Sequence, residues 1–270
     1  MPIAIRQHES LNLAKDNEMH FRIIPGDNST IVKPPHSHSW AVGLIFGTFS
    51  LPLPMIPSIY RKIGCGGTLI GPKHVITAAH CLRFKTEKNI TVVVGEHDQR
   101  IEDGEEYIQL ERPPIQHPKY IFPSSTDYDL AILVLDQVVK NKYASFALLP
   151  EPYEDCKTLT VSGWGKISRD ILSDVLRSVT FSVFPPSATS PCEMIKCQWC
   201  PSFNHDMLLC GENLEDSSRG TCGGDSGGKN YIPGTYVNSI ILYSLILIPT
   251  CVTSLMLKVH GLLKPVVERF

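Results

Sequence analysis

Four short motifs carry the residue types that nucleophilic catalysis requires. In chain order they are Cys65-Gly66-Gly67-Thr68-Leu69-Ile70, Thr77-Ala78-Ala79-His80-Cys81, Asp129-Leu130-Ala131-Ile132-Leu133 and Gly224-Asp225-Ser226-Gly227-Gly228. A serine hydroxyl is a poor nucleophile at neutral pH, so a neutral imidazole must take its proton, and a carboxylate must orient that imidazole and stabilise its cationic form. The histidine, aspartate and serine of these motifs are therefore candidates for acyl-transfer chemistry.

The motifs and their order resemble those of the chymotrypsin/trypsin family of serine proteases. The family's order of His, Asp and Ser differs from the orders found in subtilisin and in the α/β-hydrolases. The resemblance implies a catalytic triad of His80, Asp129 and Ser226. It also implies an oxyanion hole formed by the backbone N–H groups of Gly224 and Ser226. Asp127 is a less suitable orienting acid, because the family's acid directly precedes the apolar run.

The segment Phe21-Arg22-Ile23-Ile24-Pro25-Gly26 resembles the family's zymogen junction, with Pro25 where the family has a glycine. The resemblance implies cleavage after Arg22 by an activating protease. The freed amino group of Ile23 would then pair with Asp225, whose buried charge is costly without a partner. The alternative is that Arg22 is an ordinary exposed arginine. The expected organisation is a propeptide-like segment, 1–22, followed by a serine protease domain, 23–270.

The primary substrate pocket is expected to be neutral. Trypsin-like members have an acidic residue at the pocket floor, and the equivalent position here is Gly220, in a Gly-Thr-Cys run that resembles invertebrate chymotrypsin-like enzymes. Without that carboxylate, a Lys or Arg side chain would lose its charge partner, so apolar or aromatic side chains are favoured. The pocket residues implied by the resemblance are Gly220, Thr221, Leu242, Tyr243 and Ser244.

Nine cysteines favour an oxidising compartment with disulfide bonds. Glycosylation triplets at Asn28 and Asn89 point the same way, so a secreted glycoprotein is expected. Residues 1–22 contain no apolar stretch suited to a signal peptide, which leaves open either an upstream start or a failure of the export hypothesis. The resemblance implies the disulfides Cys65–Cys81, Cys192–Cys210 and Cys222–Cys251, and leaves Cys156, Cys197 and Cys200 unassigned.

An acidic segment from Gly95 to Glu106 resembles the family's calcium-binding hairpin. Catalysis of this kind needs no cofactor, so calcium would be structural. The alternative is a solvated acidic loop without a metal. The ligands implied by the resemblance are the carboxylates of Glu96, Asp103 and Glu106 and the carbonyl oxygens of Asp98 and Ile101.

The rest of the chain must position these residues, and its pattern is one of short strands. It indicates an all-β chain with one or two barrels and a helix at Val259–Phe270. The resemblance implies two antiparallel six-stranded Greek-key barrels, at about 23–140 and 141–270, with a C-terminal helix. The expected strands are Ala41–Phe46, Gly67–Ile70, Ile90–Val94, Leu130–Leu135, Leu159–Ser162 and Val179–Val183.

Composition excludes some other functions. The chain has 270 residues, 43% of them hydrophobic, and a net charge of −2, so it has no basic field for nucleic acid. Ser239–Leu257 is uncharged and is close to the roughly 20 residues that a membrane span needs. Its proline and polar residues favour buried strands over a membrane anchor.

These features together predict a secreted serine endopeptidase, activated from a zymogen, that acts through an acyl-enzyme. Its expected partners are protein or peptide substrates, the activating protease and protein inhibitors. The alternative is a catalytically impaired homologue that acts as a binding protein. It is suggested by Lys229-Asn230-Tyr231-Ile232, which departs from the family pattern of a proline and an apolar strand ending in cysteine.

Overall fold

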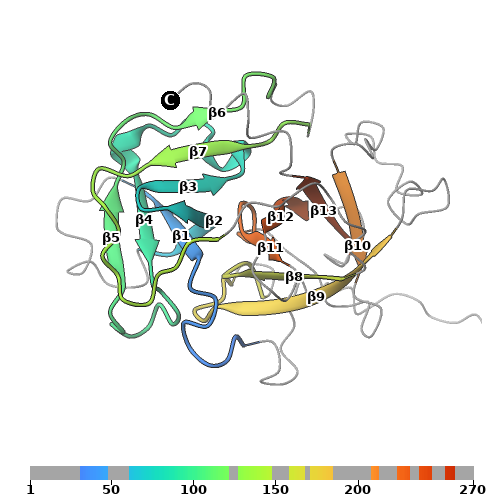
Figure 1. Cartoon of the computed structure of the whole chain (residues 1–270), viewed down its shortest axis with the longest axis horizontal. Helices are drawn as coiled ribbons and strands as arrows, with labels where there is room; N and C mark the ends of the chain where they lie inside the picture. Colours follow the sequence, from blue (N-terminus) through green and yellow to red (C-terminus); the bar gives the residue numbers. More distant parts are fainter. Residues whose placement is uncertain are drawn as a thin grey trace, which may run out of the picture.

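The fold consists of two antiparallel β units that lie side by side, blue to green and yellow to red in Figure 1. It is known from a computed structural model that describes residues 31–47, 61–121, 127–147, 158–167, 171–184, 208–212, 224–231, 237–244 and 253–258. The expected all-β class is confirmed. The predicted C-terminal helix at 259–270 lies outside the described residues.

The first unit is a sheet with the strand order β5-β4-β1-β2-β3-β7-β6. A bridge between Leu110 and Leu135 joins the chain after β5 to the chain after β7, so the sheet curls round on itself. Six strands were predicted, and the described residues form seven, of which β6 has only two residues. The bounds are β1 Ala41–Phe46, β2 Ile63–Gly71, β3 His74–Thr77, β4 Ile90–Val94, β5 Glu106–Gln109, β6 Ile115–Gln116 and β7 Ala131–Val134.

The second unit is a closed barrel with the order β10-β13-β12-β11-β8-β9, which gives the expected six strands within the described residues. The uncharged stretch 239–257 contributes to two of them, because β12 and β13 pair antiparallel. Residue 140, near which the boundary was predicted, lies in the segment between β7 and β8. The bounds are β8 Thr158–Gly163, β9 Arg177–Phe184, β10 Leu208–Glu212, β11 Lys229–Tyr231, β12 Val237–Ser244 and β13 Thr253–Lys258.

No helix within the described ranges is long and apolar enough to cross a membrane. The helical elements there are two short 3-10 turns, η4 (Ala79–Leu82) and η5 (Glu87–Asn89).

Strands β1, β4 and β7 of the first unit are buried on both faces, which explains their continuous apolar sequences. In β4, Val92 and Val94 pack inside the first unit, whereas Val93 joins a separate cluster with Trp164 and Leu176 of the second. Side chains alternate between the two faces of a strand, so a run of consecutive valines can serve both the barrel interior and the seam between the barrels. Val93 and Trp164 therefore help to hold the two units in a defined relation.

Gly43 on β1 leaves room for the seam side chains, and this predicts a measurable effect. A Cβ atom there would lie 2.4 Å from Ile63 Cδ1 and 2.8 Å from Val93 Cγ1. We expect Gly43→Ala to lower the free energy of unfolding by about 1–3 kcal/mol through overpacking. In the control Gly71→Ala the nearest atom is His74 Nδ1 at 3.5 Å, so its stability should stay within about 0.5 kcal/mol of the parent. Urea unfolding measures both, and equal losses would contradict the packing argument.

Candidate active site

Asp129 holds His80 by two contacts. Its Oδ2 atom lies 2.6 Å from His80 Nδ1, and its Oδ1 atom accepts the backbone N–H of His80 at 2.7 Å. The aspartate side chain is fully buried. The contact arises because β3 pairs with β7, with Thr77 opposite Ala131, so the turn that follows β3 meets Asp129, two residues before β7. The carboxylate therefore fixes both the ring and the backbone of this histidine.

The contact determines which nitrogen of His80 is available for chemistry. An ionised carboxylate only accepts hydrogen bonds, so the ring nitrogen that faces Asp129 must carry the proton. The other nitrogen, Nε2, is then left with a lone pair that can accept a proton from a substrate or a nucleophile. This is the arrangement that a general base requires.

Ser226 reaches the same region from the second unit. The backbone around Ser226 contacts β2 of the first unit directly, since Ser226 O accepts the N–H of Gly66 at 2.7 Å. Gly227 has φ +80°, and a Cβ atom there would lie 2.3 Å from Thr77 Oγ1 and 2.4 Å from Gly66 O. Only glycine fits this position, because both the backbone conformation and the space exclude a side chain. The serine segment is thus pressed onto β2 and β3, beside the turn that carries His80.

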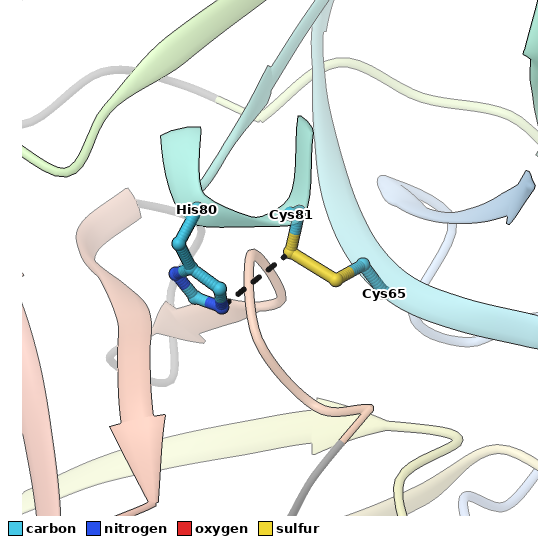
Figure 2. A group of neighbouring side chains, drawn as sticks. All are labelled: Cys65, His80 and Cys81. Carbon is cyan, nitrogen blue, oxygen red and sulfur yellow. Dashed lines mark hydrogen bonds between the residues drawn. A yellow bond between two sulfur atoms is a disulfide. The ribbon is translucent and has the colours of Figure 1, made fainter. Parts of the chain in front are cut away.

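A disulfide joins Cys65 on β2 to Cys81 in η4, the residue after His80. Figure 2 shows the imidazole directed toward this bridge, with His80 Nε2 3.8 Å from Cys81 Sγ. Cys81 Sγ also lies 3.6 Å from Ser226 O, so the bridge, the imidazole and the serine segment are neighbours. Cys65, His80 and Cys81 form the only potential three-ligand metal group in the described ranges, but both sulfur atoms belong to the disulfide, so it is not a metal site.

Asp225, next to the candidate nucleophile, is fully buried. Its Oδ1 atom accepts the N–H of Gly165 at 2.8 Å. A Cβ atom on Gly163 or Gly165 would lie 2.3 Å from atoms of this carboxylate, so the Gly-Trp-Gly run at 163–165 forms a close-fitting cradle for it. Sequence reasoning missed this cradle, for which the only signal was two glycines flanking a tryptophan. The expected partner, the amino group of Ile23, lies outside the described residues.

Several other predicted site residues are not placed. Leu242, Tyr243 and Ser244 lie on β12, where the backbone alone is described, and Cys210 likewise lies on β10. Those outside the described residues altogether are Arg22, Ile23, Cys192, Gly220, Thr221, Cys222 and Cys251. The neutral pocket and the two further disulfides therefore stay predictions.

The predicted calcium ligands lie in one loop but do not converge on one point. Glu96 is 6% exposed, and burial raises its pKa to about 8, with further upward effects from the charges of Glu105 and Asp103. Glu106 instead accepts the backbone N–H of Lys140 at 2.9 Å. Within the described ranges, no three carboxylates bring their oxygens within 4.8 Å of one another. The residues therefore do not fit the calcium-binding set that the sequence suggested.

One of the two predicted carbonyl ligands is also used in a local hydrogen bond. The carbonyl oxygen of Asp98 accepts the N–H of Ile101 at 3.0 Å, which closes a turn. One residue from outside this loop, which the sequence did not indicate, completes the cluster. Arg61, just before β2, places its Nη1 atom 3.6 Å from Glu105 Oε1.

Comparison with known proteins gives consistent results. The family model for trypsin matches residues 28–241. Mouse ovochymase-2 is 32% identical over 176 residues, which are 63% of this chain and 28% of that protein. Human kallikrein-8 is 32% identical over 201 residues, which are 72% of this chain and 67% of that protein. This chain thus spans about a quarter of ovochymase-2 and two thirds of kallikrein-8.

The fold also matches a solved structure. Neuropsin, described as a serine protease expressed in the limbic system of mouse brain, superposes with a TM-score of 0.69 over 89% of this chain and 98% of that chain. At 20% identity this likeness concerns the fold. The two relatives named above are mammalian, and the likeness to invertebrate chymotrypsin-like members stays a prediction. The family model covers most of the chain, and the chain therefore belongs to the trypsin family, whose members are serine endopeptidases.

Proposed function

We propose that this chain is a secreted serine endopeptidase, made as a zymogen, that hydrolyses peptide bonds through an acyl-enzyme on Ser226. The observation that carries the proposal is the double contact of Asp129 with the ring and backbone of His80, at 2.6 and 2.7 Å. A buried carboxylate in this position is what a histidine needs in order to act first as a base and then as an acid.

The proposed reaction has two halves. His80 Nε2 takes the proton of Ser226 Oγ as the oxygen attacks the carbonyl carbon of the substrate, and the N–H groups of Gly224 and Ser226 stabilise the oxyanion. The tetrahedral intermediate collapses when the imidazolium gives its proton to the leaving amine. Water then repeats the sequence on the acyl-enzyme, with the same histidine as base, and releases the carboxylic acid.

Activation by cleavage after Arg22 separates residues 1–22, as a propeptide, from the protease domain, 23–270. The buried carboxylate of Asp225 supports this, because such a charge is strongly stabilised by a cation that enters its site. The new amino group of Ile23 is that cation in our proposal. Asp225 is the residue before Ser226, so pairing there would set the backbone that forms the oxyanion hole.

The disulfide Cys65–Cys81 supports secretion, since such bonds persist in oxidising compartments. The proposed partners are protein or peptide substrates, the activating protease and protein inhibitors. The rival hypothesis, an impaired homologue that only binds partners, was suggested by the divergent residues after Gly228. Lys229–Tyr231 nevertheless pairs as β11 with both β8 and β12, which favours an intact second barrel.

Covalent labelling tests the proposed function. The full chain is cleaved at Arg22, with Ile23 verified as the new N-terminus by sequencing, and is then treated with a fluorophosphonate probe. We expect labelling of Ser226 only after cleavage, because the oxyanion hole is completed by activation. Ser226→Ala, cleaved in the same way, should stay unlabelled. A folded, cleaved chain that takes no label would favour the binding-protein hypothesis, and labelling of the uncleaved chain would contradict the zymogen.

The orienting role of Asp129 predicts a selective kinetic defect. We expect Asp129→Asn to lower kcat by about 10⁴-fold, the size associated with this kind of triad, with little change in KM. An amide can donate to Nδ1 and so hold the imidazole in the wrong tautomer. Asp127→Asn makes the same chemical change two residues away and should retain most activity. Similar losses in both variants would show that Asp129 has no special role.

The neutral pocket predicts substrate preference. The activated chain should cleave peptides after Phe more efficiently than after Arg, by about 10²-fold in kcat/KM, because a buried guanidinium would lack a charge partner. Gly220→Asp should raise kcat/KM for the Arg peptide, whereas Gly220→Asn, of similar size but neutral, should not. Faster turnover of Arg peptides by the parent chain would rule out this pocket assignment.

A further inference from the structure

The loop of residues 95–106 concentrates negative charge in a buried place. Glu96 is 6% exposed, and the side chains of Glu105 and Asp103 are 4% and 16% exposed. Buried carboxyl groups that repel one another either keep a proton, as the raised pKa of Glu96 indicates, or are stabilised as anions by a nearby cation. Calcium is the cation suggested by the sequence, but the predicted ligands do not converge.

The chain itself supplies a cation at this place. The side chain of Arg61 is 10% exposed, and its Nη1 atom lies 3.6 Å from Glu105 Oε1. The same guanidinium donates to the hydroxyl of Tyr107, which in turn donates to Glu105 Oε1 at 3.1 Å. Arg61 therefore reaches the acidic loop from another part of the sequence, just before β2.

Glu105 also links Arg61 to the backbone of the loop. Its second oxygen, Oε2, accepts the backbone N–H of Asp103 at 3.1 Å. The charge of Arg61 also acts on Glu96, where it favours the ionised form and so opposes the effect of burial on the pKa. On the far side, His36 Nε2 lies 3.6 Å from Asp103 Oδ2. The guanidinium thus contacts Glu105 and acts on Glu96 through its charge, whereas the basic group beside Asp103 is His36.

We propose that the guanidinium of Arg61 is the resident cation of the 95–106 loop and stands in place of a calcium ion. Calcium takes about six to eight oxygen ligands at short range. Here the Glu106 carboxylate is turned to the backbone N–H of Lys140, and a divalent ion beside Arg61 would be repelled by its fixed positive charge. The loop then keeps its conformation without calcium.

The 95–106 loop is also hydrogen-bonded to the second unit. The N–H of Gln99 donates to Asp174 O at 2.9 Å, and its side-chain amide donates to Ser173 O at 3.0 Å. Leu176 N donates to His97 O at 2.8 Å. Since these bonds tie the first half of the loop to the second unit, removal of the Arg61 charge should loosen the two units as well as the loop.

Two buried carboxyl oxygens bear on the expected effect of replacing Arg61. Glu96 Oε1 and Asp103 Oδ1 are buried and have no hydrogen-bond partner in the described part of the chain. In Arg61→Met, which keeps an apolar stem but has no charge, Glu96 and Glu105 would lose the nearby positive charge. A divalent ion could then bind where the guanidinium had been.

The test is thermal unfolding of the full chain, with Ser226→Ala in every sample to prevent self-cleavage, in millimolar calcium and in excess EDTA. We expect the Tm of the parent to be the same in both. Arg61→Met should lose several degrees in EDTA and recover part of that loss in calcium. Arg61→Lys should retain calcium independence.

Lys62→Met is the matched control, because Lys62 is the adjacent basic residue and pairs with Asp174, outside the acidic loop. It should show no calcium response. The proposal is overturned if calcium raises the Tm of the parent, or if calorimetry shows a calcium ion bound to the parent chain. It is also overturned if Arg61→Met is as stable in EDTA as Lys62→Met. The parent measurements decide the question even if Arg61→Met does not fold.

Discussion

The buried carboxylate of Asp129 is the constraint on which the rest of the site depends. A charge removed from water must be compensated by hydrogen bonds or by an opposite charge. Asp129 meets this requirement by using one oxygen for the backbone N–H of His80 and the other for its ring. The compensation that makes the burial tolerable is therefore the same interaction that aligns the imidazole for proton transfer.

That alignment is useful only if the second unit stays in register with the first. The contact of Gly66 N with Ser226 O, and the space that Gly227 leaves beside Thr77, bring the serine segment against β2 and β3 at backbone distance. Backbone contacts of this kind tolerate little displacement. The packing of Val93 against Trp164 in the seam also helps to keep the two units in this register.

The same electrostatic requirement recurs in the acidic loop. Glu105 is almost as buried as Asp129, and its partners are Arg61, the hydroxyl of Tyr107 and the backbone N–H of Asp103. In both places a side chain from another part of the sheet compensates a buried carboxylate. The difference is that the histidine partner can exchange its proton, whereas the guanidinium stays charged and serves only to hold the loop.

The sequence by itself determined the strands with continuous apolar runs. The bounds of β1 and β4 match the prediction, because strands that are buried on both faces consist almost entirely of apolar residues. It also indicated the order of the histidine, aspartate and serine motifs. Only the tertiary structure decided that β5 and β6, which lack such runs, join the first sheet, since short strands depend on their partners. It likewise decided that Arg61 lies beside Glu105, because this contact between residues 44 positions apart is created by strand pairing and leaves no local pattern.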